Sequence, residues 1–142
     1  MTPPKWLRPV AIVALVWNLL GCAAFLSDLT LTPADVANMT PDQQALYAAR
    51  PAWALAATGI AVWGGAAGCI GLVLLKRWSV PLLVASLAGV VVQDAALAGM
   101  TGALSTIGPA ALVLQGVVLV VAIGLVLLAR TASRRRWLFP PR

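Results

Sequence analysis

Three amides and one carboxylic acid stand inside long apolar stretches of this sequence, where binding or chemistry would require them. The amides are Asn18, Gln93 and Gln115, and the carboxylic acid is Asp94. Each amide lies on a helical face of small residues, where membrane helices approach closely. The amides therefore have two open interpretations. They form a small polar cavity, or they make interhelical hydrogen bonds that fix helix register, each worth about 0.6 kcal/mol.

Counting along each segment places the three amides at similar depths. At about 1.5 Å per residue they lie roughly 9 to 13 Å from the outer ends of their segments, so they can meet in one polar layer. Asp94 is a candidate proton or cation site, because an aspartate at the centre of a membrane span costs about 2.5–3.5 kcal/mol. It lies near the outer end of its segment, however. A carboxylate that simply reaches interfacial water is the open alternative.

Several chemistries lack the residues they need. The chain has no histidine and no glutamate, which excludes His-ligated haem, His-based metal sites and a histidine general base. Its two cysteines, Cys22 and Cys69, fall in different apolar segments and cannot form a zinc cluster. No nucleotide-binding motif is present. We therefore expect no enzymatic activity, no cofactor and no metal.

The segment that ends at Cys22 resembles a bacterial lipobox, Leu19-Leu20-Gly21-Cys22. Leucine fits poorly just before the glycine, and the apolar run continues past the cysteine to Leu26. We therefore expect Cys22 to remain unprocessed, as a small apolar residue within a helix.

The elements that position these residues are four apolar segments, each long enough for a membrane-spanning helix of about 20 residues. They cover residues 9–27, 52–75, 79–99 and 107–129. The chain is 61% hydrophobic and 10% charged, whereas soluble domains carry about 25% charged residues. The sequence therefore predicts an all-α membrane protein, a four-transmembrane-helix antiparallel bundle in a single domain, 1–142. Gly64, Gly68 and Gly71 in the second span predict a close helix-packing face.

Basic residues set the expected orientation. Nine of the ten lysines and arginines lie before the first span, between the second and third, or after the fourth, in a basic tail at 130–142. Only Arg50 lies in the remaining loops, which predicts that both termini are cytoplasmic. Because the net charge of +6 gathers at the ends of the spans, it is a topology signal and not a nucleic-acid site.

The first outer loop, residues 28–51, is the only sizeable loop. Thr32-Pro33-Ala34-Asp35 and Thr40-Pro41-Asp42-Gln43 both read as helix starts, and the second completes a capping box. We expect a short interfacial helix from Pro41 to about Ala49. The other loops, 76–78 and 100–106, are tight and make successive spans antiparallel neighbours.

Several short motifs are familiar in combination. They are Lys5-Trp6, Trp17-Asn18-Leu19, the stretches 45–53 and 60–65, Lys76-Arg77-Trp78, Val92-Gln93 and Gly108-Pro109. In order and spacing, over nearly the whole chain, they resemble a group of small four-span bacterial inner-membrane proteins that are often labelled "sugar transporter". The resemblance implies a multi-pass protein of the bacterial inner membrane that moves sugars.

Such a site would combine hydrogen-bonding side chains with aromatic stacking, which Asn18, Gln93, Gln115, Trp17 and Trp63 would supply. In that group apolar residues are usual at the positions of Asp94 and Gln115, so a role for either would be peculiar to this chain.

Two functional hypotheses follow. The first is a small-solute transporter of the sugar type, which with four helices needs a homo-oligomer to form a path. The second is a non-transporting membrane subunit, assembly factor or lipid-interacting module with an unidentified membrane-protein partner. The lipid bilayer is the expected partner in both hypotheses, and nucleic acid in neither.

Overall fold

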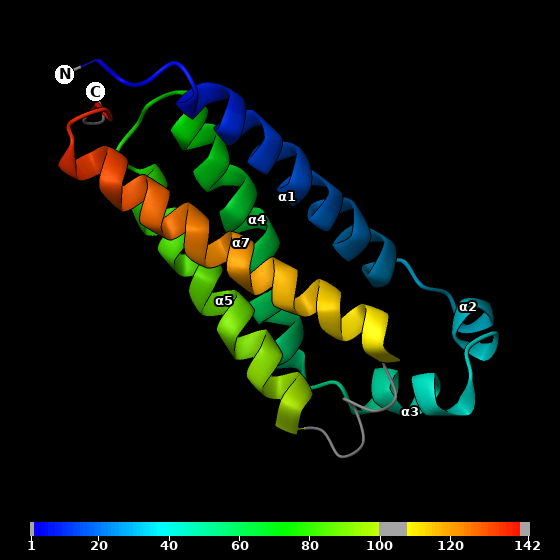
Figure 1. The fold of residues 1–142 in the computed structure, drawn as a ribbon. Helices are drawn as coiled ribbons and strands as arrows, with labels where there is room; N and C mark the ends of the chain where they lie inside the picture. The colour runs from blue at the N-terminus through cyan, green and yellow to red at the C-terminus, as the bar shows by residue number, and fades with distance from the viewer. Residues whose placement is uncertain (1, 100–107, 140–142) are drawn as a thin grey trace.

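The computed structural model describes residues 2–99 and 108–139, and within them it contains six helices and no strand. The predicted loop at 100–106 and Arg142 lie outside these residues. Four helices are long and apolar enough to cross a membrane. The predicted all-α bundle of four such helices is therefore confirmed. The helices are α1 (Leu7–Leu29), α2 (Pro33–Ala37), α3 (Pro41–Ala49), α4 (Ala52–Val73), α5 (Ser79–Gly99) and α7 (Gly108–Arg134) (Figure 1).

The residues at which α1 begins and α7 ends differ from the ends of the apolar runs, because proline and charged side chains also influence where a helix begins and ends. α1 begins at Leu7, so Pro9 is its third residue and lies in the first turn, where a missing N–H costs nothing. α7 runs to Arg134, five residues beyond the predicted end of its span at Ala129. Arg134 lies in the last turn, where a basic side chain favours the helix C-terminus. The first part of the predicted basic tail is therefore helical.

The first loop folds into two short helices, one more than expected. The hydroxyls of Thr32 and Thr40 accept hydrogen bonds from the backbone N–H of Asp35 and Gln43, and each of those side chains bonds back to the N-cap backbone. Both are complete capping boxes. The hydrogen bonds from the backbone N–H and hydroxyl of Thr32 lower the pKa of the Asp35 carboxyl below its ordinary value. The carboxylate that closes the α2 box is therefore ionised at neutral pH.

α4 is the centre of the bundle, because it packs against both α1 and α5, while α7 packs against α5. Glycines allow the closest approach between α4 and α5. A β-carbon on Gly68 would lie 2.5 Å from Leu83, one on Gly71 would lie 2.8 Å from Ser79, and one on Gly64 would lie 3.3 Å from the Leu82 carbonyl oxygen. All three glycines of the predicted packing face therefore lie in the α4–α5 contact.

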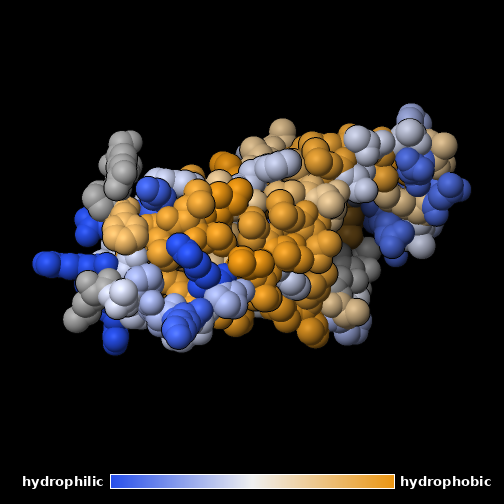
Figure 2. Space-filling view, turned by 90° about the horizontal axis from the view of Figure 1, so that it is seen from above, coloured by the Kyte–Doolittle hydropathy of each residue, from blue (hydrophilic) through white to orange (hydrophobic). Residues whose placement is uncertain are grey.

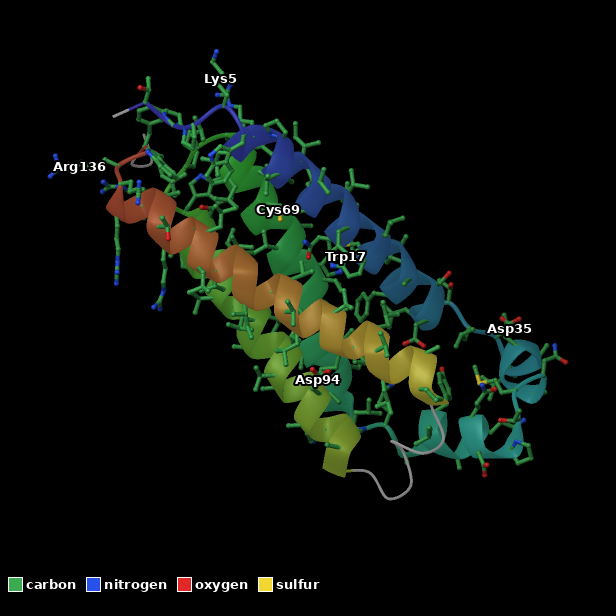
Figure 3. All side chains as sticks on the ribbon, viewed as in Figure 1. Lys5, Trp17, Asp35, Cys69, Asp94 and Arg136 are labelled. Carbon is green, nitrogen blue, oxygen red and sulfur yellow. The ribbon has the colours of Figure 1, made fainter. Side chains whose placement is uncertain are left out.

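The buried core is concentrated at one end of the bundle. At this end, called the basic end, lie Lys5, Arg8, Lys76, Arg77, Arg130, Arg134, Arg135 and Arg136, and the beginning and end of the described chain meet there (Figures 1 and 3). The core joins α1, α4, α5 and α7, and its buried residues are Leu7, Ala11, Cys69, Leu72, Leu75, Leu83, Leu125, Val126, Ala129, Ala132 and Leu138.

Residues 135–139, called the C-terminal strap, fold back across this end. The backbone N–H of Phe139 donates to the carbonyl oxygen of Leu75 at 2.6 Å, and that of Arg77 donates to the carbonyl oxygen of Phe139 at 2.9 Å. Trp137 stacks edge-on against Trp6, with ring centroids 6.1 Å apart. The strap therefore ties the start of α1, the α4–α5 turn and the end of α7 together.

Between the two ends the surface is apolar. Figure 2 shows hydrophobic residues covering the middle of the visible face, with hydrophilic residues gathered toward both ends. Many large apolar side chains on α1, α4, α5 and α7 are exposed, as expected of helices that face lipid.

Candidate functional site

The bundle contains a cavity of about 430 Å³ between α1, α4, α5 and α7. Small-molecule sites usually measure about 300–1,000 Å³ and combine apolar walls with a few polar groups. Six of the twenty lining residues are polar here. The polar ones are Asn18, Asp28, Thr58, Ser86, Gln93 and Gln115.

The cavity lies between the parts of α1 and α7 that extend beyond the core cluster. At the basic end the core cluster fills the space between the two helices, with Leu7 and Ala132 fully buried. Farther along, α1 packs on α4 and α7 packs on α5. The residues of α1 and α7 beyond the core then face each other across the cavity, which reaches Asp28 near the end of α1. The cavity therefore occupies the half of the bundle away from the basic end.

Two of the predicted amides meet on one wall. The side-chain N–H of Gln93 on α5 donates to the side-chain oxygen of Gln115 on α7 at 3.4 Å. This distance is at the long end of the hydrogen-bond range, so the contact is weak. Among the described residues, the side-chain oxygen of Gln93 and the side-chain nitrogen of Gln115 have no other hydrogen bond. Both atoms are therefore available to a ligand.

Asn18 lines the same cavity but does not join the glutamines. Its side-chain nitrogen donates to the carbonyl oxygen of Ala14 at 2.9 Å and to the sulfur of Cys69 at 3.6 Å. Its side-chain oxygen lies directly over Gly65, where a β-carbon would overlap it. Gly65 therefore provides the space that the Asn18 amide occupies, and the three amides form two separate polar positions on one cavity instead of a single layer.

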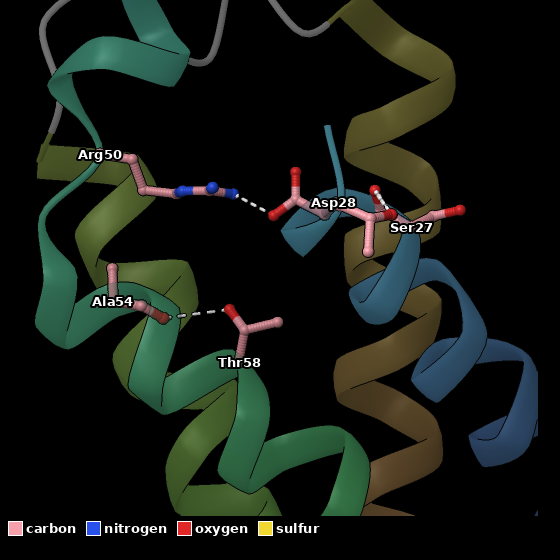
Figure 4. Close-up of polar contacts among 6 residues, drawn as sticks. Ser27, Asp28, Arg50, Ala54 and Thr58 are labelled. Carbon is pink, nitrogen blue, oxygen red and sulfur yellow. Dashed lines mark hydrogen bonds and ion pairs between the residues drawn. The ribbon is translucent and has the colours of Figure 1, made fainter. Parts of the chain in front are cut away.

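The remaining polar groups of the lining are already engaged. Asp28 forms a salt bridge with Arg50, with a 2.7 Å contact, and Thr58 donates to the carbonyl oxygen of Ala54 at 3.0 Å (Figure 4). Ser86 donates to the carbonyl oxygen of Ala61 at 2.6 Å. Asp28 is the only charged residue among the described residues of the lining, and it is paired, so this part of the lining is neutral overall.

The two predicted tryptophans lie in different places. Trp17 lines the cavity from α1 (Figure 3), next to the wall formed by Phe25. A β-carbon on Gly59 would lie 3.2 Å from the Phe25 ring, so this glycine lets the ring lie against α4. Trp63 is 48% exposed and does not line the cavity. The structure therefore gives the site one tryptophan and one phenylalanine.

Asp94 lies on α5 next to Gln93, in the half of the bundle away from the basic end (Figure 3), but it is not part of the cavity lining. One of its carboxylate oxygens, Oδ1, is buried and has no hydrogen-bond partner among the described residues. A buried carboxylate oxygen without a partner is costly when it is ionised. Asp94 is therefore outside the cavity, although it directly follows the lining residue Gln93.

Among the polar and aromatic residues of the lining, Phe25, Asp28 and Thr58 were not predicted as site residues from the sequence. For Phe25 and Asp28, helical spacing from Trp17 and Asn18 could have indicated a place in the site. Phe25 and Asp28 follow Trp17 and Asn18 by about two and three helical turns, so they lie on the same face of α1. Thr58 lies three residues before Ala61, on the small-residue face of α4.

No group of three or more potential metal ligands occurs in the part of the chain that the structure describes. Comparison of the chain with protein-family models, with curated proteins and with solved structures finds no match.

Proposed function

We propose that this chain is a small-solute transporter of the sugar type in the bacterial inner membrane. The observation that carries the proposal is the cavity of about 430 Å³, whose lining includes Asn18 of α1, Gln93 of α5 and Gln115 of α7. Amides that only fixed helix register would pack without leaving such a space. Trp17 and Phe25 add the aromatic surface on which a sugar ring stacks.

The distribution of charge supports an orientation. Eight described basic residues lie at the basic end, and the described acidic residues lie elsewhere. The positive-inside rule then places the basic end in the cytoplasm. In this orientation the cavity lies in the outer half of the membrane and the filled core closes its inner side. The structure is then an outward-facing arrangement.

Four helices provide one cavity but no closed path across the bilayer, so we propose that a homo-oligomer transports. α7 packs mainly on α5 and leaves a long apolar face, with Val113, Val120 and Leu127 each at least 60% exposed. A lipid tail covers such a face as well as a second copy of the chain does. The exposed face is therefore not by itself evidence for the oligomer.

The test is uptake by proteoliposomes that contain the purified protein. We expect entry of a radiolabelled solute from a panel of sugars and glycosides, and we expect Gln93→Leu and Gln115→Leu each to reduce the initial rate about tenfold. Each substitution removes a hydrogen-bonding group that faces the solute, and tenfold corresponds to about 1.4 kcal/mol. Trp63→Leu is the matched control, since Trp63 is exposed and outside the lining, and it should keep the rate. Absence of uptake across the panel would refute the transport proposal.

Asp94 is the proposed coupling group. A carboxyl inside a span, with one buried oxygen that has no partner among residues 2–99 and 108–139, is suited to take up a proton or cation during transport. We expect Asp94→Asn to abolish uptake driven by a proton or sodium gradient and to leave counterflow, the exchange of solute across the membrane without a gradient, within about twofold. Gradient-driven uptake that persists in Asp94→Asn would remove Asp94 from the mechanism.

The closed basic end favours a second candidate function, a membrane subunit that binds a solute without moving it. Leu7, Leu72 and Leu138 are almost fully buried there, so tightly packed side chains of the described chain fill the basic end. Solute binding without uptake, together with co-purification of a stoichiometric membrane partner, would establish this candidate over the transporter.

A further inference from the structure

Most of the cavity lining is apolar, and two open amide groups lie together on its α5–α7 wall. This pattern restricts which solutes can bind in the cavity. Fourteen of its twenty lining residues are hydrophobic or glycine. Leu20 and Phe25 of α1 and Leu114 and Val118 of α7 contribute to these walls. A free sugar carries hydroxyl groups around its whole ring, and each would need a partner when buried. A solute that also carries an apolar group can place that group against these walls and keep its hydroxyls at the polar side chains.

Two open hydrogen-bonding atoms lie together on the α5–α7 wall, apart from the Asn18 amide of α1. Ser86 and Thr58 donate to backbone carbonyls of α4, and the Asp28 carboxylate holds Arg50. What remains at the α5–α7 wall is the side-chain oxygen of Gln93 and the side-chain nitrogen of Gln115. One is an acceptor and the other a donor, which together match a hydroxyl or a pair of neighbouring hydroxyls. Because their mutual contact is 3.4 Å long, a ligand can replace it at little cost.

The charge of the lining also restricts which solutes can bind. Asp28, the only charged side chain that the described residues contribute to the lining, is paired with Arg50 at 2.7 Å. Burial of an unpaired charge costs far more than burial of a hydroxyl group that finds a partner. A charged solute would find no counter-ion in this cavity and is therefore disfavoured.

We propose that the cavity takes an uncharged amphipathic solute, whose hydroxyl-bearing end binds Gln93 and Gln115 and whose apolar body lies between α1 and α7. Short alkyl and aryl glycosides have this chemistry. The inference rests on the proposed function in that it specifies the occupant of the same site, but it concerns binding and is tested without transport.

The experiment uses the full chain in lipid nanodiscs and measures equilibrium binding of four radiolabelled probes, with empty nanodiscs subtracted. Phenyl glucoside and hexyl glucoside carry both parts of the proposed solute, free glucose lacks the apolar body, and hexyl sulfate replaces the neutral end with a charge. We expect both glycosides to bind at least tenfold more tightly than glucose and hexyl sulfate. Equal binding of glucose, or tighter binding of hexyl sulfate, would overturn the inference.

Two variants of α7 locate the binding. Ala122 lines the cavity, whereas Val120, two residues away, is 68% exposed on the outside of the bundle. Ala122→Phe places a ring in the cavity and should reduce glycoside binding at least tenfold. Val120→Phe places the same ring outside and should leave binding unchanged, which also controls for folding. Equal effects of the two variants would show that the glycoside binds elsewhere.

The outcomes separate this inference from the transport proposal. Glycoside binding that Ala122→Phe abolishes, without uptake into proteoliposomes, supports the inference and refutes transport. Uptake of free glucose with no preference for a glycoside supports transport and refutes the inference.

Discussion

Gly89→Ala is expected to destabilise the bundle by about 1–3 kcal/mol, although alanine is the better helix former. A β-carbon on Gly89 would lie 2.6 Å from the carbonyl oxygen of Ala57 and 2.9 Å from the backbone nitrogen of Ala61. Both are backbone atoms, which cannot rotate aside as a side chain can. α5 would have to move away from α4, and the move would weaken the largest helix contact of the bundle.

The chain supplies matched controls for this substitution. Gly116 and Gly124 are also helical, on α7, and a β-carbon on either would meet nothing within 4 Å. All three replacements gain the same helix propensity, up to about 1 kcal/mol, so their difference isolates the close contact. The free energy of unfolding is measured by titration of helicity with SDS in mixed micelles. If Gly89→Ala proves as stable as Gly116→Ala, the α4–α5 backbones are not in contact as described.

The loss should extend to the cavity. The carbonyl oxygen of Ala61, which the Ser86 hydroxyl contacts at 2.6 Å, belongs to the same α4–α5 contact as Gly89. A shift of α5 would also move Gln93 relative to Asn18 on α1. The close packing of small residues and the position of the amides are therefore one structural arrangement and not two separate ones.

The sequence predicted the four long helices because an apolar run of about 20 residues has few alternatives in lipid. It predicted their ends less well. Hydropathy marks where a chain leaves the lipid core, whereas a helix continues as long as its backbone bonds and end charges favour it, as α7 does through Arg134. The loop helices differ, because a local threonine capping signal fixes the start of each of them.

The cavity was only partly accessible to sequence reasoning. Residue spacing gave the faces of the helices, and those faces include Asn18, Gln93 and Gln115. Spacing does not say which helices stand apart, and the space between α1 and α7 depends on that. Trp63 illustrates the limit, since its neighbour Val62 lines the cavity while Trp63 itself points away from it. A rotation of about 100° per residue separates the two.

The strap lacked any sequence signal. The chain changes direction at Leu75, after α4, and at Arg136, after α7. Both residues have φ of 57°. Helices commonly end with a residue in this left-handed conformation, but the residue is usually glycine. Here Lys76 donates to Gly71 at 2.8 Å and Trp137 donates to Ala132 at 2.9 Å, which completes the same type of helix end on α4 and α7 without glycine at the left-handed position. The two ends then run together at the bridge between Lys76 and Phe139.

Leu138→Ala is expected to destabilise the protein by about 2–5 kcal/mol, the usual cost of a large-to-small change in a packed core. Leu138 is 2% exposed and belongs to the core cluster that joins all four long helices. The strap lies beyond the last turn of α7, at the charged end of the bundle. If it came loose, the Leu138 side chain would be exposed to water, so its burial contributes the full hydrophobic free energy.

The neighbouring residue provides the control. Phe139 is larger than Leu138 but is 53% exposed, and its backbone, not its ring, makes the hydrogen bonds to Leu75 and Arg77. Phe139→Ala keeps those bonds and should change the free energy of unfolding by no more than about 0.5 kcal/mol. A larger loss in Phe139→Ala than in Leu138→Ala would mean that the strap does not dock through Leu138. Because the strap joins the start of α1 to the end of α7, the two helices that flank the cavity, Leu138 contributes to the packing that holds these helices together at the basic end.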